Sequence, residues 1–94
     1  MAAIRFLYLV YQLEITKPAI RALRRIPANA ARLIRAKLDQ LAEDPMPAPN
    51  VKPLKGRPGC RLRVGDWRVV YELDHPRRRL IVLDIGPRGS VYDR

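Results

Sequence analysis

The chain falls into segments in which hydrophobic and polar positions repeat with different periods. Residues 4–15 are rich in β-branched and aromatic side chains, and near their end Tyr11, Leu13 and Ile15 alternate with polar residues. Alternation of this kind predicts a strand with one buried face. Residues 79–85, R-L-I-V-L-D-I, are apolar on both faces, which predicts a strand in the middle of a sheet.

The segment that follows the first strand has the spacing of two helices. Thr16 is a candidate N-cap, and Pro18 suits the first turn of a short amphipathic helix that Pro27 ends. A second helix is expected over residues 28–43. Its apolar positions are Ala31, Ile34, Leu38 and Leu41, and its polar positions include Arg32, Arg35, Asp39 and Gln40. Joined at Pro27, the two segments predict an antiparallel helical hairpin with one apolar side.

Residues 60–74 have the pattern of a β-hairpin. In G-C-R-L-R-V-G-D-W-R-V-V-Y, two alternating runs flank Gly65-Asp66, which predicts a two-residue type II′ turn. This register places Arg63 opposite Arg68, although like charges in opposed positions destabilise a sheet. One face then carries Cys60, Leu62, Val64, Trp67, Val69, Tyr71 and Leu73, and the other carries Arg61, Arg63, Arg68, Val70 and Glu72.

The stretch between the second helix and the hairpin contains five of the nine prolines of the chain. We interpret residues 45–59 as an extended, basic, proline-rich arm anchored by Leu54, because the roughly 35 residues that follow are too few for a second core. The chain is therefore expected to form one domain over residues 1–94, with residues 1–10 as an N-terminal extension of the first strand. The element order β-α-α-β-β-β predicts an α+β fold, with the helical hairpin packed on one face of a small, mainly antiparallel sheet. The arginine face of the hairpin must then be the uncovered one.

Composition and charge narrow the classes of partner. The net charge of +10 comes from 15 arginines and four lysines against nine acidic residues, which favours a polyanionic partner such as RNA, DNA, the ribosome or anionic lipid. The hydrophobic fraction of 48% excludes a disordered tail. Three cations of the arm allow two interpretations, a solvated arm or a grip on ribosomal RNA; they are Lys52, Lys55 and Arg57.

Other chemistry has little support in the sequence. The single cysteine, Cys60, lies on the apolar face, so a buried structural thiol is favoured over a nucleophile, and His75 is expected to be an ordinary loop residue. One cysteine and one histidine do not make a metal-ligand cluster, and no cofactor is expected. No apolar run is long enough to cross a membrane, so we expect a cytoplasmic protein.

Nearly the whole chain from Tyr11 onward resembles the RelE/ParE superfamily of bacterial toxins. The likeness rests on the helical hairpin, on L-K-G-R-P-G-C-R-L-R-V-G-D-W-R-V-V-Y, and on the ending I-G-P-R-G-S-V-Y-D-R. RelE-type members cut mRNA in the decoding site of the 70S ribosome, whereas ParE-type members inhibit DNA gyrase. An arginine after the last strand followed by a tyrosine is typical of RelE-like members, and Arg88 and Tyr92 occupy these places.

The resemblance implies a metal-independent endoribonuclease in which a 2′-hydroxyl attacks the neighbouring phosphate. Arginines gathered on one sheet face can hold the negative charge of that transition state, and bound phosphate would relieve their mutual repulsion. By this similarity Tyr92 stacks on or orients a base of the substrate. The residues assigned to the site are Arg61, Arg63, Arg68, Arg88 and Tyr92.

Two departures from the RelE pattern concern proton transfer. RelE-like sites often carry lysine at the positions of Arg61 and Arg63, and a histidine in the tail where this chain has Pro87. Arginine does not release its proton at neutral pH. The general base is therefore unassigned by sequence.

Three functions remain as alternatives at this stage: a ribosome-dependent mRNA interferase, a non-enzymatic gyrase inhibitor, and a plain nucleic-acid-binding module. A fourth, structural interpretation makes the arginine face a solubility device. The resemblance also implies an acidic cognate antitoxin as partner. The helix arginines are expected to face solvent or to be masked by that antitoxin; they are Arg21, Arg24, Arg25, Arg32 and Arg35.

Overall fold

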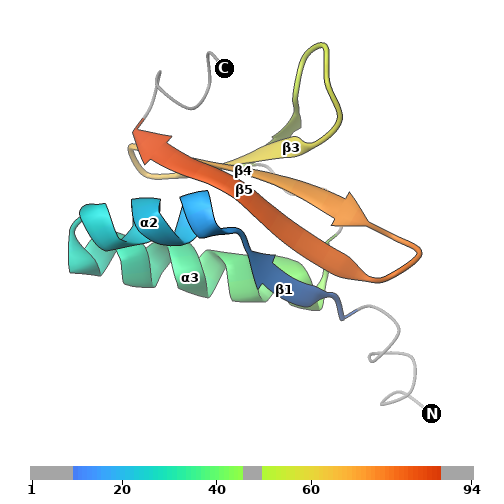
Figure 1. Cartoon of the computed structure of the whole chain (residues 1–94), viewed down its shortest axis with the longest axis horizontal. Coiled ribbons are helices and arrows are strands. Elements are labelled where there is room, and N and C mark those ends of the chain that lie inside the picture. Colours follow the sequence, from blue (N-terminus) through green and yellow to red (C-terminus); the bar gives the residue numbers. More distant parts are fainter. Residues whose placement is uncertain (1–9, 46–49, 88–94) are drawn as a thin grey trace.

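The computed structural model of the chain describes residues 10–45 and 50–87, which form two helices and a five-stranded sheet (Figure 1). The elements in chain order are β1 (Gln12–Ile15), α2 (Lys17–Arg25), α3 (Ala28–Glu43), β2 (Val51–Pro53), β3 (Cys60–Val64), β4 (Trp67–Asp74) and β5 (Arg79–Pro87). The first part of the predicted N-terminal strand and the predicted C-terminal tail lie outside the described residues.

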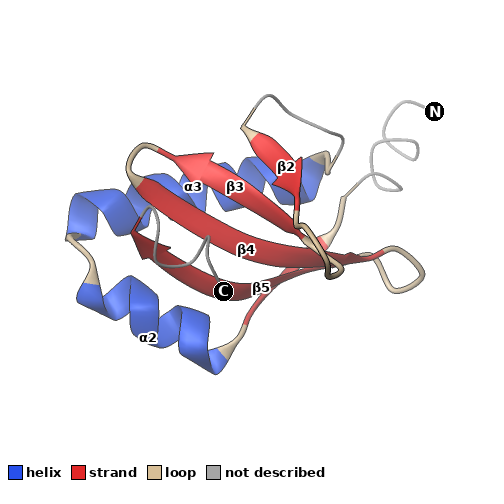
Figure 2. Ribbon diagram, turned by 90° about the horizontal axis from the view of Figure 1, so that it is seen from above, coloured by secondary structure: helices blue, strands red, loops and turns tan. Residues whose placement is uncertain are grey.

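The strands lie in the order β1-β5-β4-β3-β2 (Figure 2). β1 runs parallel to β5, and every other neighbouring pair is antiparallel. The predicted α+β fold is confirmed, and so is the position of the last strand inside the sheet. A strand within the predicted arm was not expected: Val51–Pro53 pairs with β3, and Arg63 N donates to Asn50 O at 2.9 Å. Pro53 is tolerated there because β2 is an edge strand.

The helices cover one face of the sheet, as Figure 1 shows. α2 packs against β5, and α3 packs against β1 and β3. The side chains buried between the two layers are Ala19, Ile34, Leu38, Leu41, Ala42, Leu62, Val64, Val69, Tyr71, Leu80, Val82 and Ile85. The apolar side predicted for the second helix therefore does face the sheet, and the predicted bounds of residues 28–43 are confirmed.

The hairpin has the predicted register. Arg63 pairs with Arg68 and Val64 with Trp67, so Gly65-Asp66 forms the turn. Gly65 has a φ of +58° and Asp66 is not among the described residues with positive φ, as a type II′ turn requires.

Thr16 does precede α2, but its hydroxyl forms no capping hydrogen bond with the helix. Instead Oγ1 donates to the carbonyl oxygens of Val82 at 2.8 Å and Leu83 at 3.3 Å in β5. Leu83 is the extra residue of a β-bulge, since Tyr71 pairs with Val82 while Val70 pairs with Asp84. The predicted N-cap is therefore a link between the start of α2 and the bulge in β5.

Candidate functional site

Four cationic side chains lie on the sheet face that the helices leave uncovered, which is the face seen in Figure 2. They are Lys52 on β2, Arg61 and Arg63 on β3, and Arg68 on β4, and we call them the basic sheet surface. Lys52 is the register partner of Arg61, and Arg63 is that of Arg68, so the four form two adjacent pairs. Directly opposed residues have their Cβ atoms about 4.5–5.5 Å apart. Four positive charges therefore share a small area of the sheet.

The two arginines of one pair differ in their surroundings. Arg63 is exposed, whereas Arg68 is only 8% exposed and its Nη1 donates to the Trp67 carbonyl oxygen at 3.3 Å. The expectation of a fully uncovered arginine face is thus wrong for Arg68. Val70, on the same strand and the same face, is also buried, at 1% exposed.

Lys52 joins the basic sheet surface only because β2 pairs with β3. The sequence placed it in the arm with Lys55 and Arg57, and the structure separates these residues. Lys55 and Arg57 are exposed in the loop after β2, whose ends are joined by a hydrogen bond from Leu54 N to Gly59 O at 3.0 Å. Of the three cations predicted to bind RNA, Lys52 therefore lies on the basic sheet surface, and the other two lie in the loop.

The bulge in β5 adds a carboxylate beside these cations. Leu80 and Val82 face the helices, so strict alternation would point Asp84 toward the core. The extra residue at the bulge reverses this, and Asp84 pairs with Val70 in the row that contains Arg61 and Lys52. Sequence reasoning missed Asp84 because an apolar run does not reveal where a bulge lies.

Arg68 is paired with a buried glycine of β5. Its register partner on β5 is Gly86, two residues beyond Asp84 on the same face. Asp84 itself is half-buried, and its Oδ1 accepts a hydrogen bond from Ile85 N at 2.9 Å. The carboxylate is therefore held in place at the border of the basic sheet surface.

The rest of the uncovered face is acidic or neutral. Glu14 on β1 contacts Arg79 at 3.6 Å, and Asp74 at the end of β4 contacts Arg77 at 3.4 Å. Glu72 lies between these ends and the arginines. The cations on β2, β3 and the start of β4 thus form a cluster apart from these ion pairs.

Two residues assigned to the site by sequence, Arg88 and Tyr92, lie outside the described residues. The described part of β5 ends at Pro87, the register partner of Trp67. Their part in the site remains a proposal that rests on the resemblance.

The aromatic residues of β4 lie on the sheet face that the helices cover, and they are part of the core, as expected. Tyr71 is 1% exposed, and burial raises the pKa of its phenol above the usual value, with a further contribution from Cys60 beside it. Trp67 and Cys60 pack against the same core. His75 lies in an exposed turn, as expected, where its Nδ1 is 2.6 Å from the hydroxyl of Tyr11.

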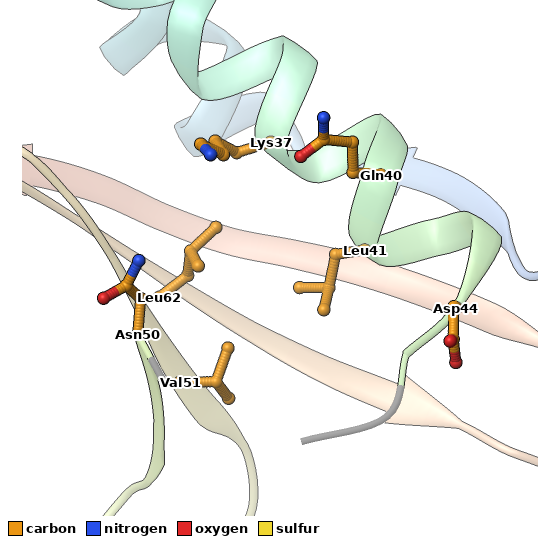
Figure 3. A pocket seen from close by; sticks show the side chains of 7 residues that line it. All are labelled: Lys37, Gln40, Leu41, Asp44, Asn50, Val51 and Leu62. Carbon is orange, nitrogen blue, oxygen red and sulfur yellow. The ribbon is translucent and has the colours of Figure 1, made fainter. Parts of the chain in front are cut away.

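A cavity of about 180 Å³ lies on the helix side of the sheet, between α3 and the strands β2 and β3 (Figure 3). Leu41, Val51 and Leu62 point into it, and polar side chains surround it. The polar residues are Lys37, Gln40, Asp44 and Asn50. Because Leu62 and Arg63 point to opposite faces, this cavity is separate from the basic sheet surface.

The helical hairpin carries a second cationic surface, which we call the basic helix surface: Arg21, Arg24 and Arg25 on α2, and Arg32 on α3. All four are exposed, α2 contains no acidic residue, and none of the four forms an ion pair within the described part of the chain. Ile20 and Leu33, 37% and 50% exposed, lie among them in the sequence. The surface thus offers both charge and apolar area.

Residues 10–45 and 50–87 contain no group of side chains that could hold a metal ion and no helix that could span a membrane. No three His, Cys, Asp or Glu side chains gather there in a way that could hold a metal ion. Neither of the helices in these ranges is long and apolar enough to span a membrane.

Comparisons with known proteins agree with this architecture. Residues 13–92 match the family described as "ParE toxin of type II toxin-antitoxin system, parDE". A chain of the archaeal RelE–RelB complex from Pyrococcus horikoshii is 29% identical, with a TM-score of 0.76 over 86% of this chain and 98% of that one. A chain of the RelBE2 toxin–antitoxin complex from Mycobacterium tuberculosis is 21% identical, with a TM-score of 0.75 over 87% of this chain and 95% of that one. The isolated Escherichia coli RelE toxin is 22% identical, with a TM-score of 0.73 over 89% of this chain and 93% of that one.

None of the curated proteins matches the chain. The family match covers most of the sequence, and the similar solved structures share the arrangement of two helices on one face of the sheet. The chain belongs to the ParE toxin family of type II toxin–antitoxin systems, within the RelE/ParE superfamily.

Proposed function

We propose that the chain is a toxin that cleaves mRNA in the decoding site of the ribosome. The observation that carries this proposal is the pair Arg63–Arg68, extended by Lys52 and Arg61 into four adjacent cations. Like charges in directly opposed positions repel each other, and a bound polyanion would relieve that repulsion. The 29% identity to a chain of the archaeal RelE–RelB complex supports the RelE-type assignment.

The proposed chemistry is metal-independent attack of a 2′-hydroxyl on the adjacent phosphate. The arginines of the basic sheet surface hold the phosphate and stabilise the negative charge that develops on its oxygens. Arg88 adds a further cation from the tail, and Tyr92 stacks on or orients a base. Lys55 and Arg57 extend the contact to the RNA backbone from the exposed loop after β2.

The ribosome supplies what the arginines do not. Arginine binds phosphate but does not exchange protons at neutral pH, so much of the rate enhancement must come from positioning. Holding the 2′-oxygen in line with the leaving 5′-oxygen contributes several orders of magnitude to a rate. We therefore expect codon-phased cleavage on ribosomes and negligible cleavage of free RNA. The cytoplasm is the corresponding location.

An acidic antitoxin is the proposed protein partner. Several of the similar solved structures are complexes of a toxin with its antitoxin. The basic sheet surface and the basic helix surface lie on different layers of this molecule. An acidic chain that folds on binding can neutralise both while it covers Ile20 and Leu33.

One observation favours a second candidate: the matching family model bears the name of the ParE toxin. A ParE-type toxin inhibits DNA gyrase without chemistry of its own. In that case the cations would act only as contact residues, and no RNA would be cut.

The two candidates separate in one set of assays on the purified wild-type protein. Toeprinting on translating ribosomes detects codon-phased cleavage, and a DNA supercoiling assay with gyrase detects inhibition. Phased cuts that vanish in Arg63→Ala, with supercoiling unaffected, would support the mRNA interferase. Inhibited supercoiling with intact mRNA would establish the alternative. Equal cutting of free and ribosome-bound mRNA would contradict the ribosome requirement.

A further inference from the structure

One row of residues across the sheet places a carboxylate and an ammonium group on the two sides of the arginines. We propose that Asp84 accepts the proton of the attacking 2′-hydroxyl and that Lys52 donates a proton to the leaving 5′-oxygen. This inference rests on the proposed endoribonuclease function and assigns the proton carriers that the arginines cannot provide.

The row follows from three register pairs. Lys52 on β2 faces Arg61 on β3, Arg61 faces Val70 on β4, and Val70 faces Asp84 on β5. Neighbouring strands lie about 4.8 Å apart, so the Cα atoms of Lys52 and Asp84 are separated by about 14 Å. In the proposed complex a phosphate bound by the arginines would lie between them, over Arg61 and not over Val70, which is 1% exposed. Its attacking and leaving oxygens, which must be on opposite sides for in-line displacement, can then point toward opposite ends of the row.

The bulge in β5 is an independent reason to assign a role to Asp84. If β5 alternated regularly through Leu83 with no bulge, Asp84 would point toward the helices, as Val82 does. Bulges are common beside active sites, where they redirect one side chain. This bulge is held by the hydroxyl of Thr16, which donates to the carbonyl oxygens of both Val82 and Leu83. The fold thus maintains an irregularity whose result is a carboxylate at the basic sheet surface.

The residue types match the two proton transfers. Among the charged residues of the two rows that form the surface, Asp84 is the carboxylate that can accept a proton, and Lys52 is the cation that can release one. Asp84 is half-buried, and its Oδ1 accepts a hydrogen bond from Ile85 N. Lys52 is exposed on the edge strand, where its long side chain can reach the leaving group.

The step balances without a co-reactant. The 2′-oxygen loses its proton to the Asp84 carboxylate and forms a bond to phosphorus. The bond between phosphorus and the 5′-oxygen breaks, and that oxygen takes a proton from the Lys52 ammonium. The products are a 2′,3′-cyclic phosphate and a free 5′-hydroxyl. Exchange with water then returns the proton from Asp84 and restores the charge of Lys52.

A purely structural role for Asp84 predicts an effect of opposite sign. If the carboxylate only offsets the charge of the arginines, its removal makes the surface more positive, so RNA binding strengthens and cleavage does not slow. If it is the general base, cleavage slows despite the stronger binding. Asp84→Asn separates these cases because the amide oxygen can still accept the bond from Ile85 N.

The first experiment measures single-turnover mRNA cleavage on programmed ribosomes. We expect Asp84→Asn to cleave about 10²- to 10⁴-fold more slowly than wild type, the range typical of a lost general base, with ribosome binding and thermal stability unchanged or increased. Glu72→Gln is the matched control, since Glu72 is a half-buried carboxylate on the same face outside the two rows, and it should keep the wild-type rate. An Asp84→Asn rate equal to or above that of wild type would overturn the role of Asp84.

The second experiment tests Lys52 with an mRNA whose scissile 5′-oxygen is replaced by sulfur, a leaving group that needs no proton. On the normal substrate Lys52→Ala should be about 10²-fold slower or more. On the sulfur substrate it should match wild type, and the control Lys17→Ala, which removes an exposed lysine at the start of α2, should match wild type on both. Equal slowing of Lys52→Ala on both substrates would show that Lys52 only binds. If wild type itself does not cleave, the proposed function fails instead.

Discussion

Arg63 and Arg68 occupy directly opposed positions in the β3–β4 hairpin, yet only Arg63 is exposed. Arg68 is 8% exposed and hydrogen-bonds to the Trp67 carbonyl oxygen. Arg63 is therefore accessible to a ligand, whereas Arg68 is packed into the structure around it. Substitution of the two residues should have different consequences for folding and similar consequences for activity.

Arg63→Ala should separate stability from activity. Removal of the exposed charge relieves repulsion within the pair, so the midpoint of thermal unfolding should not fall. Cleavage on ribosomes should slow about 10²- to 10³-fold, the usual effect of losing one preorganised electrostatic contact. Thermal melts and growth inhibition of the same variant provide the two measurements. Unfolding of Arg63→Ala, or full toxicity, would show that the active-site assignment is wrong.

Arg68→Ala should lose both stability and activity. The sequence alone predicts that it behaves like Arg63→Ala, but the buried stem and the hydrogen bond to Trp67 add a structural role. We expect its free energy of unfolding to fall by about 1–3 kcal/mol, in addition to the loss of activity. Leu62→Ala, on the covered face, is the reference for a purely structural change and should lose about 2–5 kcal/mol. Chemical denaturation compares the three variants. Unchanged stability of Arg68→Ala would mean that its burial contributes nothing.

The antitoxin prediction concerns the basic helix surface. Replacing Arg21, Arg24 and Arg25 with glutamate should weaken binding of the acidic antitoxin and reduce the dependence of its affinity on salt, because rim charges act mainly through long-range attraction. Ribosomal cleavage should be unaffected, since these residues lie on the opposite layer from the basic sheet surface. Titration calorimetry at two salt concentrations measures the effect. An unchanged affinity would place the antitoxin on the sheet face alone.

Much of the fold could be predicted from local pattern. Strict alternation around Gly65-Asp66 leaves one register for the hairpin, because a slip by one residue would bury three arginines. Pro27 and Pro45 bound the second helix without help from the rest of the chain. These features depend on neighbours in sequence, so the sequence was sufficient for them.

What could not be predicted depends on pairing between distant segments. β2 has three residues, one of them proline, so it shows no alternation of its own, and only contact with β3 makes it a strand. The bulge at Leu83 lies in a run that is apolar on both faces, which hides the point where the register shifts. Lys52 and Asp84 therefore reach the basic sheet surface through pairing between distant segments. Their positions in the sequence do not show that they lie in the same row as Arg61.

Thr16 offers a test of one such long-range contact. Thr16→Val removes the donor to the carbonyl oxygens of Val82 and Leu83 and should lower the free energy of unfolding by about 0.5–1.5 kcal/mol. Hydrogen exchange should become faster at the amides of residues 82–85, and Thr16→Ser should retain wild-type protection. Faster exchange confined to the first turn of α2 would instead support a capping role.

The last prediction concerns alkaline pH and the buried phenol of Tyr71. Burial, with a smaller contribution from Cys60, raises the pKa of this phenol in the folded state. Below the unfolded-state pKa of about 10, both states keep the proton and stability does not depend on this group. Above it, the unfolded state releases the proton first, so the free energy of unfolding should fall by about 1.4 kcal/mol per pH unit from this residue. Chemical denaturation between pH 8 and 11.5 measures the slope. Tyr71→Phe lacks the group but keeps the ring in the core, so subtracting its curve removes the effect of lysines and of exposed tyrosines. If wild type and Tyr71→Phe lose stability in parallel above pH 10, the phenol titrates alike in both states, and its burial does not protect the proton.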